Sequence, residues 1–129
     1  MLVRTGRQQL QLKDVTDGTA STIMVGEKLL AQGKFHGASC CDDNEPAFRP
    51  GWEHEIFRVC NGNPNTAPAT DRQRLDGLSN EVQRFGSAHP GGFQVAMGDA
   101  SIRTINYVID LPTMRDLCIR NDGQVVGDF

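Results

Sequence analysis

Apolar residues alternate most regularly in the C-terminal third of the chain. Phe93, Val95 and Met97 are separated by single residues that are polar or small, the period expected of a strand with one buried face. A short turn sequence follows, and a second run rich in β-branched residues occupies 102–105. The pattern therefore predicts a β-hairpin.

The link between these strands, Gly98-Asp99-Ala100, determines which residues face each other. A loop of two residues would align the apolar residues of both strands on one face, whereas a loop of three would place Val95 opposite Arg103 and give a poorer core. We predict the two-residue loop. Ala100 would carry some strain in such a turn, because alanine tolerates positive φ less well than glycine does.

Another strand is predicted over 22–28, which is rich in β-branched residues. In a regular strand Ile23 and Val25 would point to one face and Met24 to the other. The chain thus offers an additional partner for the hairpin, and the sheet it predicts is small.

A helix is predicted over 110–120, with Asp110 or Leu111 at its N-cap and Pro112 in its first turn. The apolar residues of this segment recur at helical spacing and define one face: Leu111, Met114, Leu117 and Cys118. Residues 121–123, Asn-Asp-Gly, tolerate the left-handed conformation and end the helix. We expect it to cover the apolar face of the sheet.

The remaining segments are irregular. Residues 1–13 are polar and read as a flexible lead-in, and 53–59 could form a short strand. Residues 61–80 lack any period and are interpreted as a long surface excursion. The chain is therefore expected to hold a single domain over 14–129. Its fold class is α+β: a small antiparallel β-sheet, loop-rich, with one short C-terminal helix packed on it.

Composition agrees with a modest core. The chain has 129 residues, of which 38% are hydrophobic and 6% aromatic, with 14 glycines and a mean hydropathy of -0.40. This balance favours a loop-rich β or α+β domain over a helical bundle. The net charge is -3 with acids and bases interspersed, so nucleic-acid binding is disfavoured. The sequence contains no apolar run long enough for a signal peptide or a membrane span.

Four cysteines are present, and their spacing includes no Cys-x-x-Cys pair, which argues against a zinc ribbon or a redox motif. Cys40 and Cys41 are adjacent and rarely bond each other. In an oxidising compartment the best disulfide would join Cys60 to one of that pair. The alternative is four free thiols that include Cys118.

The three histidines lie on three different segments and share no metal-binding spacing. A metal-dependent hydrolase that uses His54, His89 and Asp99 is arithmetically possible, because ligands need only meet in space, and His36 could also contribute. We expect instead that the imidazole of His89 bonds a turn backbone or Asp99 and so fixes its loop.

No other arrangement of polar residues gives a recognisable catalytic motif. Ser87 lies two residues before His89, which would make a cramped dyad, and the chain has neither a Gly-x-Ser-x-Gly elbow nor a phosphate-binding loop. Glu27 emerges from an apolar strand, and a structural ion pair with Arg84 or Arg103 is expected. The sequence therefore predicts that the protein is not an enzyme.

Three motifs in the order they occur resemble a large pseudopilin-like family that is abundant in planctomycete bacteria. Residues 15–27 are similar to the family's Asp-Gly-Thr-Ser segment, and the acidic run at 42–45 is followed by Gly51-Trp52. His89, nine further residues and Asp99 resemble the family's C-terminal signature of His, nine residues and Asp-Gly. Here Ala100 stands in place of that glycine.

This resemblance implies a setting more than a reaction. Family members begin with a hydrophobic prepilin helix, so it implies a soluble head that is membrane-anchored in the full-length form and lies outside the cytoplasm. The function implied is non-catalytic: contacts with other pseudopilin-like or envelope proteins in a type II secretion or type IV pilus-like assembly. The signature residues that the resemblance marks are Asp17, Gly18, Glu27, Trp52, His89 and Asp99.

Two further possibilities follow from particular segments. Asp42, Asp43 and Glu45 are weak candidates for calcium ligands: they do not fit the EF-hand template, but calcium binding by major pseudopilins supports them by resemblance. No other cofactor is expected. The alternative function is a glycan- or small-solute-binding module, in which 61–80 and Trp52 form a shallow site.

Overall fold

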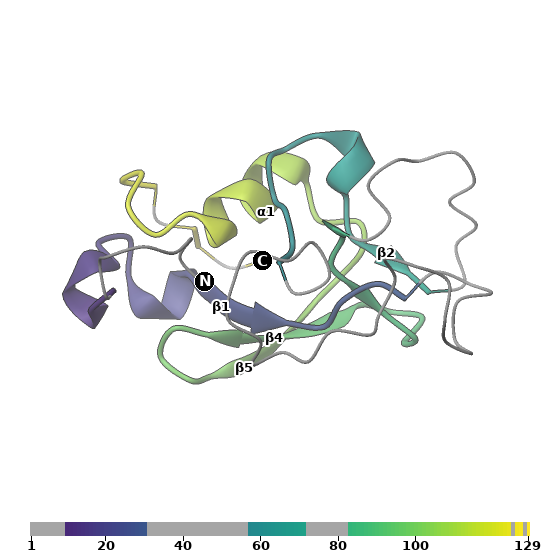
Figure 1. Cartoon of the computed structure of the whole chain (residues 1–129), viewed down its shortest axis with the longest axis horizontal. Helices are drawn as coiled ribbons and strands as arrows, with labels where there is room; N and C mark the ends of the chain where they lie inside the picture. The colour runs from purple at the N-terminus through teal and green to yellow at the C-terminus, as the bar shows by residue number, and fades with distance from the viewer. Residues whose placement is uncertain (1–9, 31–56, 72–82, 125, 128) are drawn as a thin grey trace.

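The computed structural model describes residues 10–30, 57–71, 83–124, 126–127 and 129 (Figure 1). Two short 3-10 turns precede the first strand, a third lies before the second strand, and the hairpin and helix follow. In chain order the elements are η1 (Leu12–Asp14), η2 (Thr19–Ser21), β1 (Ile23–Gly26), η3 (Pro64–Thr66), β2 (Ala69–Thr70), β3 (Gly86–Ser87), β4 (Phe93–Met97), β5 (Ile102–Ile105) and α1 (Leu111–Cys118).

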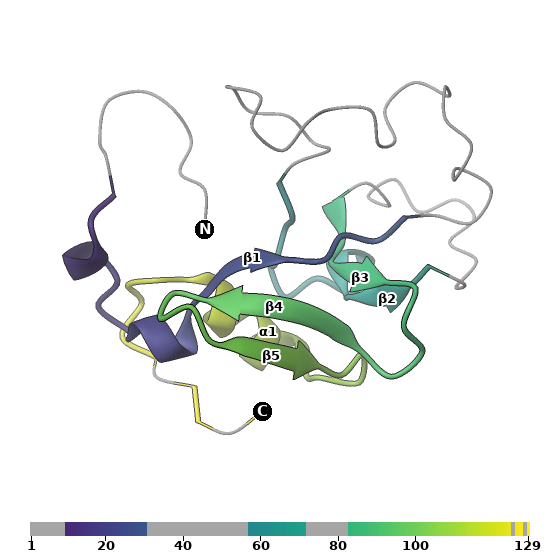
Figure 2. The same cartoon turned by 90° about the horizontal axis from the view of Figure 1, so that it is seen from below.

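A three-stranded antiparallel sheet with the order β1-β4-β5 forms the main layer, and α1 lies across one of its faces (Figure 1). Figure 2 looks onto the opposite face, with α1 behind the strands. A second sheet pairs β2 with β3 in parallel, and an isolated bridge between Lys28 and Phe85 links it to the extension of β1. The predicted α+β class, with a small antiparallel sheet and one short C-terminal helix, is confirmed.

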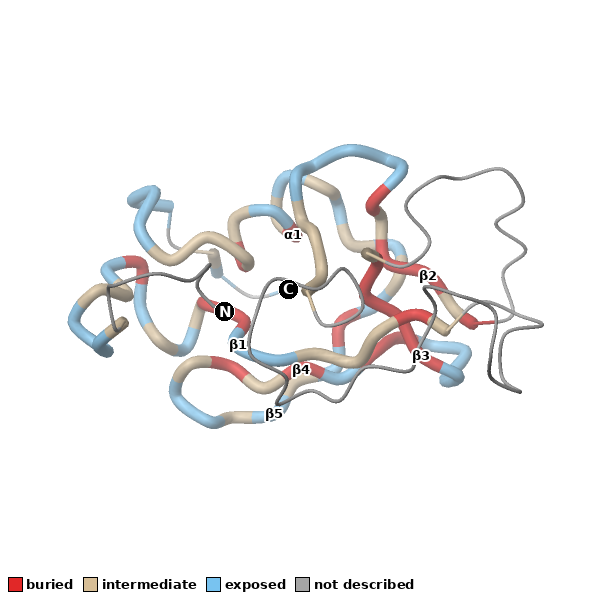
Figure 3. Tube along the Cα trace, viewed as in Figure 1, coloured by how far each residue is buried: buried red, intermediate tan, exposed pale blue. Residues whose placement is uncertain are grey.

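The core lies between the sheet and α1. Phe93, Val95 and Met97 on β4 are almost completely buried, and they form one buried cluster with Met114 and Leu117 of α1. Figure 3 colours the chain by this burial. Full burial of each such side chain contributes about 1.5–3 kcal/mol to folding. The alternation that predicted β4 and the helical spacing that predicted α1 therefore mark the two faces that meet.

Helix α1 also begins as the sequence indicated. Asp110 is the N-cap, and its side chain accepts the N–H of Thr113 over 2.9 Å, while Pro112 occupies the first turn. This hydrogen bond lowers the pKa of Asp110 below its ordinary value.

The predicted two-residue hairpin loop is wrong. Val95 pairs with Arg103 and Phe93 pairs with Ile105, so three residues, 98–100, form the loop. Met97 N–H donates to the carbonyl of Ser101 over 2.9 Å and closes the hairpin. The position opposite Val95 need not be apolar, because the Arg103 guanidinium lies 5.1 Å from the centre of the Phe129 ring, which the C-terminal segment supplies.

The expected facing of β1 is also wrong, because the strand contains a bulge. Ile23 pairs with Met97 but Val25 pairs with the adjacent Ala96, so β1 has one extra residue there. Ile23 is consequently buried in the core whereas Val25 is 60% exposed on the opposite face. A single inserted residue reverses the alternation that the sequence pattern assumed.

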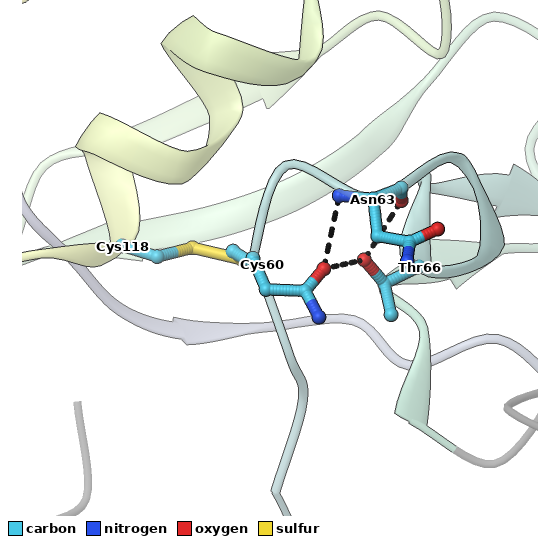
Figure 4. The surroundings of a disulfide bond; sticks show 5 residues. Cys60, Asn63, Thr66 and Cys118 are labelled. Carbon is cyan, nitrogen blue, oxygen red and sulfur yellow. Dashed lines mark hydrogen bonds between the residues drawn. A yellow bond between two sulfur atoms is a disulfide. The ribbon is translucent and has the colours of Figure 1, made fainter.

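The disulfide differs from the predicted pair. Cys60 is bonded to Cys118, at the last residue of α1, and not to Cys40 or Cys41, which lie outside the described residues (Figure 4). No local pattern indicates that the end of α1 lies against the segment 57–60. Within the described part of 53–59, residues 57–59 form no strand.

The first part of the predicted surface excursion is more regular than expected. Asn61 accepts hydrogen bonds from the N–H of Asn63 and the hydroxyl of Thr66, at 3.0 and 2.6 Å, which shapes the turn that contains η3 (Figure 4). The chain then enters β2, where Ala69 is buried. Residues 61–71 are therefore part of the packed fold.

Candidate functional site

The signature residues within the described ranges gather at the two ends of the β1–β4 pair. At one end is the hairpin tip. Asp99 accepts the N–H and the hydroxyl of Ser101 on the same carboxylate oxygen, at 2.9 and 2.7 Å, and these hydrogen bonds lower its pKa. Its own N–H donates to the carbonyl of Thr19, and Gly98 N–H donates to that of Thr22, at 3.1 and 2.8 Å. Asp99 thus shapes the turn and docks it onto the segment before β1.

Asp17 stabilises the N-terminal segment near the same end of the fold by bonding the loop after α1. Its buried carboxylate accepts the backbone N–H groups of Asp122 and Gly123, at 2.8 and 2.9 Å, and ties the N-terminal segment to the loop after α1. Burial raises the pKa of Asp17, but these hydrogen bonds outweigh it and the net pKa lies below the ordinary value. Gly18 follows with a φ of 98°, a conformation that favours glycine.

Glu27 fastens the opposite end. One carboxylate oxygen accepts the N–H of Gln94 over 2.7 Å, and the other lies 3.8 Å from Nε2 of His89. The expected ion pair with an arginine is therefore wrong. Arg84 points to the β2 side, where it donates to the carbonyl of Ala67, and Arg103 lies against Phe129.

The loop that carries His89 is held by a closed set of hydrogen bonds. The buried hydroxyl of Ser87 donates to the carbonyl of Gly92 and accepts the N–H of His89, at 3.0 and 3.1 Å. The hydroxyl of Tyr107 lies 2.9 Å from the carbonyl of His89 and donates to it. Ser87 therefore meets His89 through the backbone and not through the imidazole, so the pair has no catalytic geometry.

His89 and Asp99 do not meet. The residues between them include the whole of β4, and a five-residue strand is roughly 15 Å long. Of the two partners expected for the His89 imidazole, a turn backbone or Asp99, the second is thus wrong, and the hydrolase set loses this pair. Within the described ranges, no three His, Cys, Asp or Glu side chains converge on a point where a metal could bind.

Several predicted positions lie outside the described residues: His36, Cys40, Cys41, Asp42, Asp43, Glu45, Trp52 and His54. None of the helices in the described ranges is long and apolar enough to cross a membrane.

Residues 1–112 match a family described as a protein of unknown function, DUF1559. The chain belongs to this family. No curated protein and no solved structure matches it.

Sequence reasoning missed three contributors to the frame of this DUF1559 domain. Thr19 receives the hairpin tip, Tyr107 holds the loop at 88–91, and the amides of 122–123 receive Asp17. Each acts through backbone groups brought together by long-range packing, so residue type and spacing carry little signal. Tyr107 alone carried a signal in the sequence, since it is the chain's only tyrosine.

Proposed function

We propose that this chain is the non-catalytic head domain of a pseudopilin-like protein of the cell envelope. It acts through contacts with other pseudopilin-like or envelope proteins, in a type II secretion or type IV pilus-like assembly, and needs no cofactor. The observation that carries the proposal is that Asp17, Glu27 and Asp99 each bond backbone amides of the domain itself.

The chemistry of these groups supports a structural role. A general acid or base must reach a substrate with a pKa near the working pH, yet the pKa values of Asp17 and Asp99 are lowered further from neutrality. The hydroxyl of Ser87 is buried and already donates to a carbonyl. The polar groups of these residues are engaged with the backbone of the domain, which supports a role in stabilising the fold and not in binding a substrate.

The disulfide supports the proposed location. Such bonds persist in oxidising compartments and are rare in the reducing cytosol. The Cys60–Cys118 bond spans 58 residues, and closing a loop of that length contributes about 4 kcal/mol in the chain-entropy account. A small core benefits strongly from such a contribution, which favours folding outside the cytoplasm.

Cell fractionation tests the proposal on the full-length protein in its own host. Free thiols are blocked with maleimide at lysis, and thiols released by later reduction are labelled with a heavier maleimide and mapped by mass spectrometry. We expect the protein in the envelope fraction with Cys60 and Cys118 labelled only after reduction. A cytosolic protein with both thiols blocked at lysis would contradict the proposal.

Variants test the non-catalytic role. His89→Ala should alter assembly contacts only in proportion to its loss of stability. The proposed function would be overturned if the native chain catalysed a reaction and His89→Ala abolished that activity without lowering the melting temperature.

A further inference from the structure

Strand β5 is the edge of the main sheet (Figure 2). The closing bond from Met97 to Ser101 makes that pair hydrogen-bonded, and hydrogen-bonded pairs alternate along an antiparallel ladder. Arg103 therefore bonds β4, whereas the N–H and C=O groups of Ile102 and Thr104 point away from it. Within the described part of the chain, no residue bonds these four groups.

An apolar row ends at this edge. Val25, Ala96 and Ile102 are aligned across β1, β4 and β5 on the face opposite α1. Val25 is 60% and Ile102 65% exposed, so the row is open to solvent. A residue added beside Ile102 by a further strand would lengthen this row, because directly paired residues share a face.

The other face of β5 carries a positive charge. Arg103 is half-buried beside Val95 with the Phe129 ring over its guanidinium. Its charge helps to lower the pKa of Asp99, but no carboxylate of the described residues lies within ion-pair distance of it. A residue added opposite Arg103 would therefore meet a cation, and an acidic side chain fits there.

We propose that the β5 edge takes up an extended strand from a partner protein. The strand would bond the backbone of Ile102 and Thr104, place apolar residues beside the row, and set an acidic residue against Arg103. This inference rests on the proposed function, because it names the surface through which the head domain makes its contacts.

The charge pattern disfavours a second copy of the chain as the occupant. A symmetric antiparallel pairing that satisfies all four outward groups sets Ile102 of one copy against Thr104 of the other. It also sets Arg103 of one copy directly opposite Arg103 of the other, and like charges in that position are destabilising. An acidic strand removes this conflict.

A tethered strand tests the proposal. The segment Lys-Thr-Val-Glu-Val-Thr-Lys is joined to Phe129, whose ring already lies beside β5, through a flexible linker of about ten glycines and serines that raises its effective concentration. Amide hydrogen exchange is measured by NMR. We expect exchange at Ile102 and Thr104 to slow by at least about tenfold.

Two controls isolate the mechanism. Thr104→Pro removes an outward N–H that the sheet itself does not use, so the fold should remain while protection is lost. Replacing the glutamate of the tethered segment by lysine should weaken protection through repulsion from Arg103.

Three outcomes overturn the inference: unchanged exchange with the tether, protection that survives Thr104→Pro, or protection of both amides in the untethered chain. In the last case, sedimentation distinguishes a second copy from the chain's own segments. If the protein lies in the envelope but the tethered strand leaves exchange at the β5 edge unchanged, this inference alone is contradicted. If the tethered strand is taken up but the protein is cytosolic and reduced, the proposed function alone is contradicted.

Discussion

The backbone N–H of Asp99 donates to the carbonyl of Thr19 over 3.1 Å, so the tip of the β4–β5 hairpin is tied to the turn before β1. At the far end of the same strand pair, Glu27 bonds Gln94 and lies near His89. The polar residues of the signature thus hold both ends of one pair of strands. The nine residues between His89 and Asp99 therefore reflect the length of β4, because the two side chains lie at opposite ends of that strand and do not form a shared site.

Ala100 is the weak point of the hairpin tip. It has a φ of 69°, the left-handed conformation that costs an L-residue about 1–2 kcal/mol, whereas glycine adopts it freely. Ala100→Gly is therefore expected to raise the free energy of unfolding by about 0.5–1 kcal/mol after glycine's greater chain entropy is counted. Chemical denaturation measures the change.

Ala96→Gly is the matched control. Ala96 lies in β4 with extended backbone, where glycine should destabilise by about 0.5–1 kcal/mol. If both substitutions destabilise equally, the left-handed conformation of Ala100 is not the source of strain.

Local patterns predicted β1, the two hairpin strands and α1 but not β2 or β3, and long-range contacts decided how the elements fit together. The helix was predictable because Asp110, Pro112 and the spacing of Met114 and Leu117 all act within one segment. The hairpin register was not, because it requires Ala100 to adopt a left-handed φ of 69° in a three-residue loop, and residue type alone does not favour that for alanine.

The same reason explains the disulfide and the bulge. Cys60 meets Cys118 only after α1 has packed on the sheet. The bulge in β1 is defined by its pairing with β4, where Val25 is opposite Ala96, so the sequence of β1 by itself does not indicate it. In the candidate site, separation of His89 from Asp99 could have been foreseen, since a predicted strand lies between them.

Removal of the disulfide should weaken the domain strongly. The double variant Cys60→Ser with Cys118→Ser is expected to lower the free energy of unfolding by roughly 4 kcal/mol, the loop-closure contribution of a 58-residue span. Urea denaturation with and without reductant measures this loss. The reductant should shift the midpoint of the native chain towards that of the double variant, and an unchanged native midpoint would show that the bond adds little.

The carboxylate of Asp17 should make the stability of the fold decrease at acidic pH. Its pKa is lower in the folded than in the unfolded protein, so its stabilising contribution is present above about pH 4, the ordinary range of an aspartate, and is lost as the pH falls through the folded value. Asp17→Asn should therefore flatten the fall of melting temperature between neutral and acidic pH. Asp14→Asn is the control, because the half-buried Asp14 carboxylate accepts only the local N–H of Gln11, and it should change the slope less than Asp17→Asn does.

The two adjacent glycines before β4, Gly91 and Gly92, should respond differently to the same substitution. A Cβ added to Gly92 would lie 2.4 Å from the carbonyl oxygen of Ile105, whereas one added to Gly91 meets no atom within 4 Å. Gly92→Ala must move backbone of the β4–β5 ladder and is expected to destabilise by about 1–3 kcal/mol, as overpacking does. Gly91→Ala should stay within about 0.5 kcal/mol of the native chain. Thermal unfolding of the pair separates close packing from flexibility: equal losses would mean that the loop needs glycine for its conformation and not for the approach of Ile105.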